Sequence, residues 1–272
     1  MKKLLLIIFL CLSLNANINQ AVLGIIGSSD FNTHRNLINT LFKNQSYFYT
    51  NGSLDYAKIS QTLQNNNLLK LSLGSTQTIE ATFIFNSNPK KSFKNINDIL
   101  KSIGIQNFVT INQSVSENQL KWSIKVQTAA AINPLRLSQE LQNTNCRVVD
   151  IKKEGNNKWS YYIDSKKSSI YKAEDLVTKA SVSLKKPVKP YILEIANTDA
   201  IKIDSNIGNN WYPNIIFYDD SFNVIDVFES ESLHKNLRVD IPTNTRFVKI
   251  DDFYALTNIK NGLNITKERE NV

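Results

Sequence analysis

Cysteine, glycine and histidine are scarce in this chain of 272 residues. The sequence has 2 Cys, 8 Gly and 2 His. Cys11 lies in an N-terminal apolar segment, so a mature chain without that segment keeps only Cys146 and cannot form an intramolecular disulfide. Few glycines leave little material for phosphate-binding loops, and neither a P-loop nor a dinucleotide-binding fingerprint is present. We therefore predict no cofactor.

The two histidines give little support for catalysis or metal binding. His34 falls on the polar side of a predicted helix and His234 in a predicted loop. Neither has metal-ligand spacing to the other or to Cys146, and neither has the context of a Ser-His-Asp triad. We predict a non-enzymatic protein with no catalytic residue and no metal site.

Aspartates near the C-terminus leave two chemical alternatives open. A hydrolase of the glycosidase class uses two carboxylates, and a structural Ca²⁺ needs oxygen ligands at a turn. The loop Asp-x-Asp-x-Asp-Gly is absent, and solvated turns explain the acids more simply. The aspartates in question are Asp219, Asp220, Asp226, Asp240, Asp251 and Asp252.

An apolar run long enough to cross a bilayer is also lacking. The N-terminal run Leu4–Leu14 follows two lysines and precedes Ala16. A transmembrane helix needs about 20 apolar residues, whereas a charged start, a short apolar run and a small residue are typical of a secretory signal peptide. We expect residues 1–16 to be removed, with cleavage after Ala21 or an uncleaved anchor as alternatives, and the mature chain to be periplasmic.

Positive charge exceeds negative charge. The 32 Lys and Arg against 24 Asp and Glu give a formal net charge of +8. In an exported protein this balance favours an anionic surface or an acidic partner. The lysines are dispersed and no nucleic-acid-binding motif is present, so we predict no nucleic acid partner.

A helix-strand-strand pattern recurs along residues 17–164. Helical segments have apolar residues three and four apart, and the segments after them alternate with the period of two that is typical of half-buried strands. Before the first copy, 21–28 is predicted as a strand and 30–44 as a helix. The predicted copies are 54–67, 68–73 and 77–87; 92–104, 107–115 and 119–127; and 133–145, 146–153 and 157–165.

Aromatic residues mark the second strand of each copy. Trp122 and Trp159 lie in identical Lys-Trp-Ser triplets, and Phe83 lies at a similar interval before Trp122. Large rings there are predicted to pack against the helices, with ligand stacking as the alternative. Neighbouring copies would form an antiparallel sheet with helices on one face, which predicts an α+β fold.

The remainder of the chain changes in character. Residues 165–189 are rich in Lys and Ser and are predicted as a linker with a short helix at 173–180. From residue 190 onward helical periodicity disappears, and six short alternating segments predict a small β-sandwich at 190–265 followed by a tail at 266–272.

The segment "TRFVKIDDFYAL" at 245–256 resembles the late strands of discoidin-like and galactose-binding-like sandwiches. That resemblance implies carbohydrate or protein binding through exposed loops. The candidate loop is 205–214, where an exposed tryptophan beside two amides would stack on a sugar ring. The alternative is that this tryptophan plugs one end of the sandwich. The candidate ligand-binding residues are Asn209, Asn210, Trp211 and Tyr212.

A chain rich in Asn, Lys and Ile with a Met-Lys-Lys start is similar to exported proteins of Campylobacter- and Helicobacter-type bacteria. Periplasmic accessory scaffolds of their flagellar motors also contain strand-helix-strand-strand units. This resemblance implies an envelope scaffold, with other envelope proteins or further copies of the chain as partners. The alternative function is binding of peptidoglycan or surface polysaccharide through the sandwich.

Overall fold

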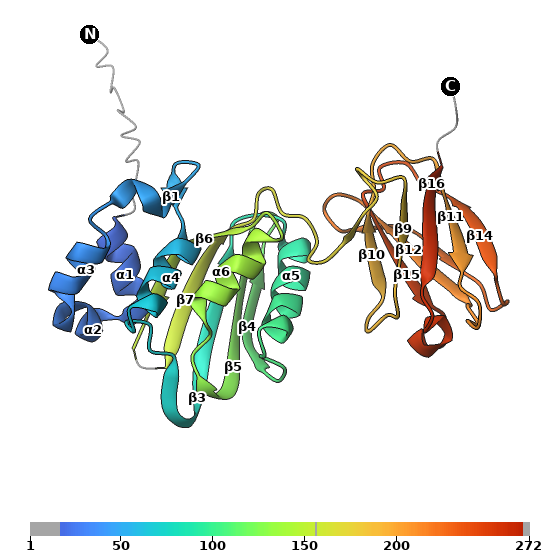
Figure 1. Cartoon of the computed structure of the whole chain (residues 1–272). Helices are drawn as coiled ribbons and strands as arrows, with labels where there is room; N and C mark the ends of the chain where they lie inside the picture. The colour runs from blue at the N-terminus through green and yellow to red at the C-terminus, as the bar shows by residue number, and fades with distance from the viewer. Residues whose placement is uncertain (1–16, 156, 269–272) are drawn as a thin grey trace, which may run out of the picture.

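The computed structural model describes residues 17–155 and 157–268. It has two bodies: helices on one face of a sheet, and then a two-sheet β body (Figure 1). This confirms the predicted α+β class with a small all-β sandwich after the helical part. The predicted signal peptide and the end of the predicted tail lie outside the described residues. No helix among the described residues is both long and apolar enough to cross a membrane.

The first body is built on a five-stranded sheet with the order β4-β5-β3-β7-β6. The central strand β3 pairs antiparallel with β5 and parallel with β7, so one hairpin lies on each side of it. The strands are β3 (Ser72–Phe85), β4 (Val109–Val115), β5 (Leu120–Ala130), β6 (Arg147–Lys153) and β7 (Lys158–Asp164).

Helices α4 (Tyr56–Asn65), α5 (Pro89–Ser102) and α6 (Pro134–Gln142) cover one face of this sheet (Figure 1). Both α5 and α6 have proline in the first turn, where no backbone donor is lost. The Asp55 and Asn133 side chains cap α4 and α6 by accepting backbone N–H bonds. The sequence thus fixes where these helices start.

The hairpins β4–β5 and β6–β7 are equivalent in register. The pair Val115–Leu120 closes the first hairpin, and the pair Lys153–Trp159 is the last of the second. Each hairpin then has a one-residue bulge at the same distance from its turn, at Ile111 and at Val149. Because a bulge is a specific local feature, its recurrence at one place indicates a repeated unit.

This register corrects the predicted alignment of the tryptophans. Counted from the turns, Trp122 corresponds to Tyr161, so the two Lys-Trp-Ser triplets are out of step. The rings of Trp122 and Tyr161 lie on either side of Phe83, with centroids 6.0 and 5.3 Å from it. All three rings are buried in the core, as predicted for an aromatic at this place, whereas Trp159 lies two pairs nearer its turn than Tyr161.

The first predicted copy is only partly correct. Helix α4 is followed by the single long strand β3 and not by a hairpin. Both edges of β3 are occupied by β5 and β7, so the sheet has no place for a second strand from this copy.

The predicted strand at 21–28 is wrong. Residues Ile18–Ile26 form helix α1, which packs on β6, and the predicted helix at 30–44 is split into α2 (Ser28–Thr33) and α3 (Arg35–Leu41). A short apolar run has the same composition in a buried strand and in a buried helix, which explains the error. The 3₁₀ turn η1 (Gln45–Phe48) and a small hairpin of β1 (Tyr49–Thr50) and β2 (Ser53–Leu54) lead into α4.

The second body packs two sheets face to face. Their orders are β13-β12-β15-β10-β8 and β14-β11-β16-β9. Trp211, Ile215 and Ile250 are among the fully buried residues between the sheets. The strands are β8 (Glu174–Asp175), β9 (Ser181–Ser183), β10 (Tyr191–Glu194), β11 (Ala200–Ser205), β12 (Pro213–Tyr218), β13 (Val224–Glu229), β14 (Asn236–Asp240), β15 (Phe247–Asp252) and β16 (Leu263–Glu268), with the turn η2 (Leu256–Ile259) before β16.

The sandwich begins earlier than the sequence predicts. The segment predicted as a linker contributes β8 and β9 to the two sheets, and no helix forms at 173–180. Leu176 is fully buried in the sandwich core, so this segment is held by packing.

The two bodies meet at a small third core. Ile170, Ile192 and Phe247 are buried together. The Lys91 Nζ of α5 lies 5.8 Å from the centre of the Phe247 ring and 3.4 Å from Asp220 Oδ1. Contacts at the start of α5 therefore connect the first body to the sandwich.

Candidate interaction sites

Trp211, the centre of the predicted ligand-binding loop, is 0% exposed. Its indole Nε1 donates a 3.0 Å hydrogen bond to the backbone oxygen of Asp251. Of the two alternatives for this ring, the exposed indole is wrong, because the ring completes the core between the two sheets. Its burial matches the alternative reading of a ring that plugs the sandwich.

The other predicted ligand-binding residues lie around this plug. Asn209 clamps the loop by accepting from Asn261 N and donating to Gly262 O, at 2.9 and 2.7 Å. Asn210 is exposed. The Tyr212 ring makes an edge contact, with a 5.0 Å centroid distance, to Tyr254, which is 58% exposed. The loop therefore presents Asn210 and the Tyr212–Tyr254 pair.

The C-terminal aspartates hold loops in place. Asp252 is 5% exposed and accepts hydrogen bonds from the backbone of Tyr212, Tyr254 and Ala255 and from the Asn258 side chain. Among the described residues no group of three or more His, Cys, Asp or Glu has metal-site geometry. The interpretation of Asp252 as a solvated acid is wrong, because its carboxylate is buried.

Among the described residues, His234 has a serine hydroxyl as a hydrogen-bond partner but no carboxylate partner. Its Nε2 lies 3.0 Å from Ser230 Oγ, and that oxygen also accepts from Ser232 N in a tight turn. No carboxylate is hydrogen-bonded to His234 in the described part of the chain. The pair therefore lacks the third member that orients a catalytic histidine.

Cys146 is 2% exposed at the start of β6. Burial raises the pKa of its thiol to about 11. Since the thiolate is the nucleophile, a thiol held neutral in this way is unreactive at neutral pH.

Strand β4 is a bare edge of the first sheet. All seven of its residues are exposed, and three are apolar: Val109 at 66%, Ile111 at 43% and Val115 at 55%. Within the described residues, β5 is its only hydrogen-bonded neighbour. The strand has no charged residue and no proline. Such an edge offers free N–H and C=O groups to another strand.

Every other sheet edge in the described residues is protected. Helix α1 covers β6, whereas β1, β2, β8 and β9 have only 2 or 3 residues. Strand β13 carries Asp226 and Glu229, and β14 carries Arg238 and Asp240. Charges, short strands and covering elements are the usual means of blocking edge pairing. Only β4 is long, uncharged and uncovered among them.

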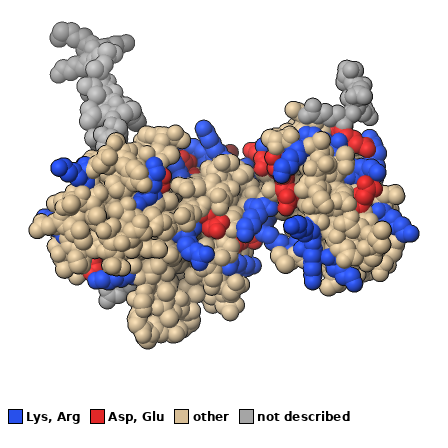
Figure 2. Space-filling view, in the orientation of Figure 1, with Lys and Arg blue, Asp and Glu red and all other residues tan. Residues whose placement is uncertain are grey.

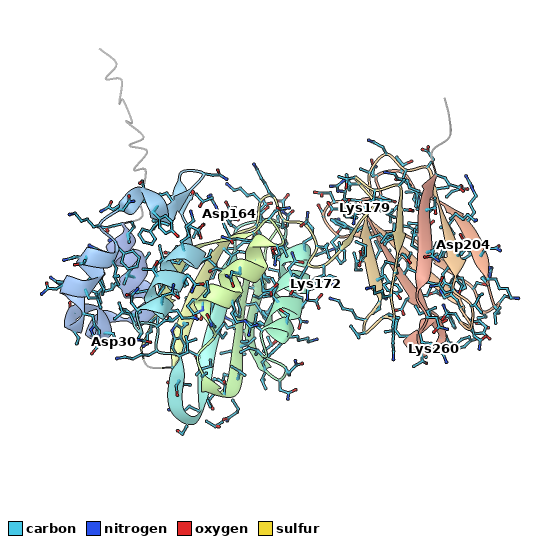
Figure 3. All side chains as sticks on the ribbon, in the orientation of Figure 1. Asp30, Asp164, Lys172, Lys179, Asp204 and Lys260 are labelled. Atoms are coloured by element: carbon cyan, nitrogen blue, oxygen red, sulfur yellow. The ribbon has the colours of Figure 1, made fainter. Side chains whose placement is uncertain are left out.

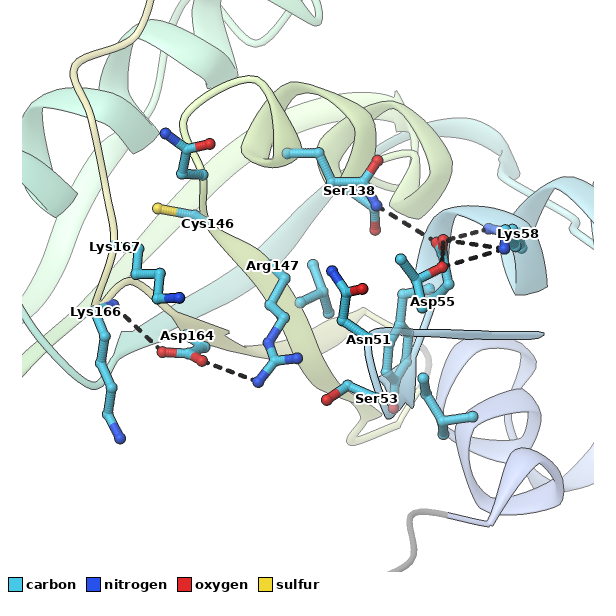
Figure 4. A pocket seen from close by; sticks show the side chains of 16 residues that line it. Asn51, Ser53, Asp55, Lys58, Ser138, Cys146, Arg147, Asp164, Lys166 and Lys167 are labelled. Carbon is cyan, nitrogen blue, oxygen red and sulfur yellow. Dashed lines mark hydrogen bonds and ion pairs between the residues drawn. The ribbon is translucent and has the colours of Figure 1, made fainter. Parts of the chain in front are cut away.

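A wide groove of about 1010 Å³ lies on the first body, between the β1–β2 hairpin and the start of β6 (Figure 4). Its lining side chains are mostly polar. Asp164, at the end of β7 (Figure 3), receives a 3.1 Å bond from Arg147 on one wall. Elsewhere on the surface, Lys and Arg are spread over the visible face of both bodies (Figure 2).

Neither a protein-family model nor a curated protein matches this chain. Among solved structures, the chain is similar to the secreted serine protease VesC from Vibrio cholerae, with a TM-score of 0.25 and 9% sequence identity. The alignment covers 74% of this chain and 45% of the protease chain. A TM-score this low carries no inference about fold or activity.

Proposed function

We propose that this chain is a non-catalytic interaction protein of the bacterial envelope, located in the periplasm, which docks a partner by strand addition at β4. The observation that carries the proposal is the contrast among the sheet edges: β4 is uncharged and uncovered, whereas the other described edges are blocked. An extended partner segment would satisfy the free backbone groups of β4 and cover Val109, Ile111 and Val115.

The face of the sheet opposite the helices favours an acidic partner strand. Lys121 on β5 lies directly across from Ser114 of β4 and has no carboxylate partner among the described residues, whereas Lys125, across from Val109, pairs with Glu80 at 3.2 Å. A strand added to β4 would lie about 10 Å from β5, two inter-strand spacings away. That distance is about one Debye length at 0.1 M salt, so acidic residues on the added strand would still be attracted.

In-cell photo-crosslinking tests this function. A photoreactive amino acid at Ile111 is compared with the same group at Val227 on β13, because these side chains are 43% and 44% exposed and both lie on edge strands. The proposal expects a discrete crosslinked product from position 111 and none from position 227. Equal products from both positions, or none from 111, would contradict it.

A place in the flagellar motor is the more specific form of this proposal. It rests on composition and on the order of the structural elements. A knockout strain should then show reduced motility and an altered motor by cryo-tomography. Normal motility with an unaltered motor would contradict a role in the flagellar motor.

Glycan binding through the sandwich is the second candidate function. It is favoured by the exposed Tyr254 ring, which contacts Tyr212 and offers an aromatic face. Tyr254→Ala should abolish retention on peptidoglycan or surface polysaccharide. Tyr47→Ala is the matched control, because Tyr47 is also 58% exposed but lies in the first body. Equal retention of both variants would contradict glycan binding.

A further inference from the structure

The groove of the first body has a basic end, at which two lysine side chains have no ion-pair partner among the described residues. Arg147, Lys166 and Lys167 are exposed residues that line it, together with Asp164 (Figure 4). No carboxylate lies within ion-pair distance of the Lys166 or Lys167 ammonium in the described part of the chain. Two cationic heads at this end are therefore free to bind an anion.

The acids of the groove are already engaged. Asp164 accepts from Arg147 Nη2 and from the backbone of Lys166, at 3.1 and 3.3 Å. Asp55 accepts from the first turn of α4 and from the Thr50 hydroxyl. Burial opposes ionisation of Asp164, but hydrogen bonds from Lys166, Asn86 and Arg147 hold the pKa of its carboxyl below the ordinary value. Neither carboxylate is available to neutralise the two lysines.

The rest of the groove offers amides and hydroxyls. Asn51, Ser53 and Gln142 also line the groove, and Gln142 donates to Asp55. Ser138 also lines the groove and is 2% exposed, and its Oγ has no hydrogen-bond partner. A buried hydroxyl without a partner costs free energy unless a bound molecule satisfies it.

The lining selects among anionic ligands. Tyr56 is its single aromatic residue, and that ring is 3% exposed. A sugar chain would find no aromatic face to stack on. Amide side chains, in contrast, match the donors and acceptors of a peptide backbone.

We infer that this groove binds a short acidic peptide in an extended conformation. Its carboxylates lie against Arg147, Lys166 and Lys167, and its backbone runs along Asn51 and Gln142. This site is separate from the β4 edge, so it does not depend on strand addition.

Isothermal titration of the full chain with tetraglutamate tests the inference. Binding is expected at low salt and should weaken as salt screens the charges. Replacing Lys166→Gln and Lys167→Gln together should weaken binding by about 10-fold or more, because two charge-assisted contacts are lost. Tetraglutamine should not bind.

The control is the pair Lys185→Gln and Lys186→Gln, adjacent exposed lysines far from the groove lining. It should leave binding within about 2-fold, since charges outside the groove are screened by water and salt. Three results would overturn the inference: no binding of tetraglutamate, an equal loss in the control pair, or equal binding of tetragalacturonate, which carries the same charge on a sugar chain. Unchanged thermal melting of both double variants separates a binding effect from misfolding.

Discussion

Gly24 of α1 lies directly against Ile151 of β6. A Cβ atom added at Gly24 would be 2.0 Å from the Ile151 backbone oxygen, closer than any side chain tolerates. This contact lets α1 cover the β6 edge, while the opposite edge of the same sheet, β4, is left bare. One edge of the sheet is thus covered by a helix, whereas the backbone groups of the other edge are exposed.

Gly24→Ala should destabilise the first body. The new methyl group must push α1 away from β6, at a cost of about 1–3 kcal/mol for overpacking. Urea unfolding measures the loss, and Gln20→Ala on the exposed side of α1 is the control. Equal stability of the two variants would mean that α1 does not pack closely against the β6 edge.

The register of the repeat predicts which aromatic rings are coupled. A double-mutant cycle between Phe83→Leu and Tyr161→Leu should give a coupling of about 0.5–1.5 kcal/mol, the usual worth of a stacked pair. The cycle between Phe83→Leu and Trp159→Leu should give a coupling near zero. Similar couplings in both cycles would contradict the register derived from the two bulges.

Alkaline pH should destabilise the protein through Cys146. Burial raises the pKa of its thiol to about 11, above the ordinary value of 9.0 that it has in the unfolded chain. Between these values the unfolded chain releases a proton that the folded chain keeps, so the free energy of unfolding falls as pH rises from about 9 to about 11. Below pH 9 the thiol is neutral in both the folded and the unfolded chain, so its contribution to the free energy of unfolding is fully present there.

Comparison with Cys146→Ala isolates this contribution. Chemical unfolding at several pH values should show a shallower fall for the variant, because buried tyrosines remain in both chains. Parallel pH profiles would show that the thiol does not contribute.

The joint between the bodies should depend on Asp98. Its carboxylate lies 2.9 Å from Lys94 Nζ and 2.7 Å from Lys189 Nζ, where Lys189 lies just before the sandwich strand β10. Asp98→Asn should speed trypsin cleavage after Lys185, because the segment loses its anchor on α5. Proline follows Lys186 and Lys189, so trypsin does not cut after either of them. Asp226→Asn on exposed β13 should have no effect, and equal cleavage rates would argue against the anchor.

The hairpins and their helices could be predicted because their signals are local. Pro134 with Asn133, and the alternation in β5 and β7, specify a helix start and half-buried strands without reference to the rest of the chain. The α1 helix could not be identified in this way, because the short apolar run around Ala21 fits two kinds of element.

Register and edge position depend on the whole fold. In register, Trp159 lies two pairs nearer its turn than Trp122 lies to its own, and the identical triplets in the sequence do not show this shift. Likewise, the uncharged segment Val109–Val115 is visible in the sequence, but its place at the sheet edge depends on the strand order. The sequence leaves the exposure of Trp211 open, because burial of the ring depends on both sheets.

Hydrogen–deuterium exchange of the chain, alone and with the partner captured by crosslinking, tests the central claim most directly. Strand addition predicts that the partner slows amide exchange in Val109–Val115, while exchange in β13 (Val224–Glu229) is unchanged. Protection elsewhere with unchanged exchange in Val109–Val115 would show that the bare edge is not the docking site.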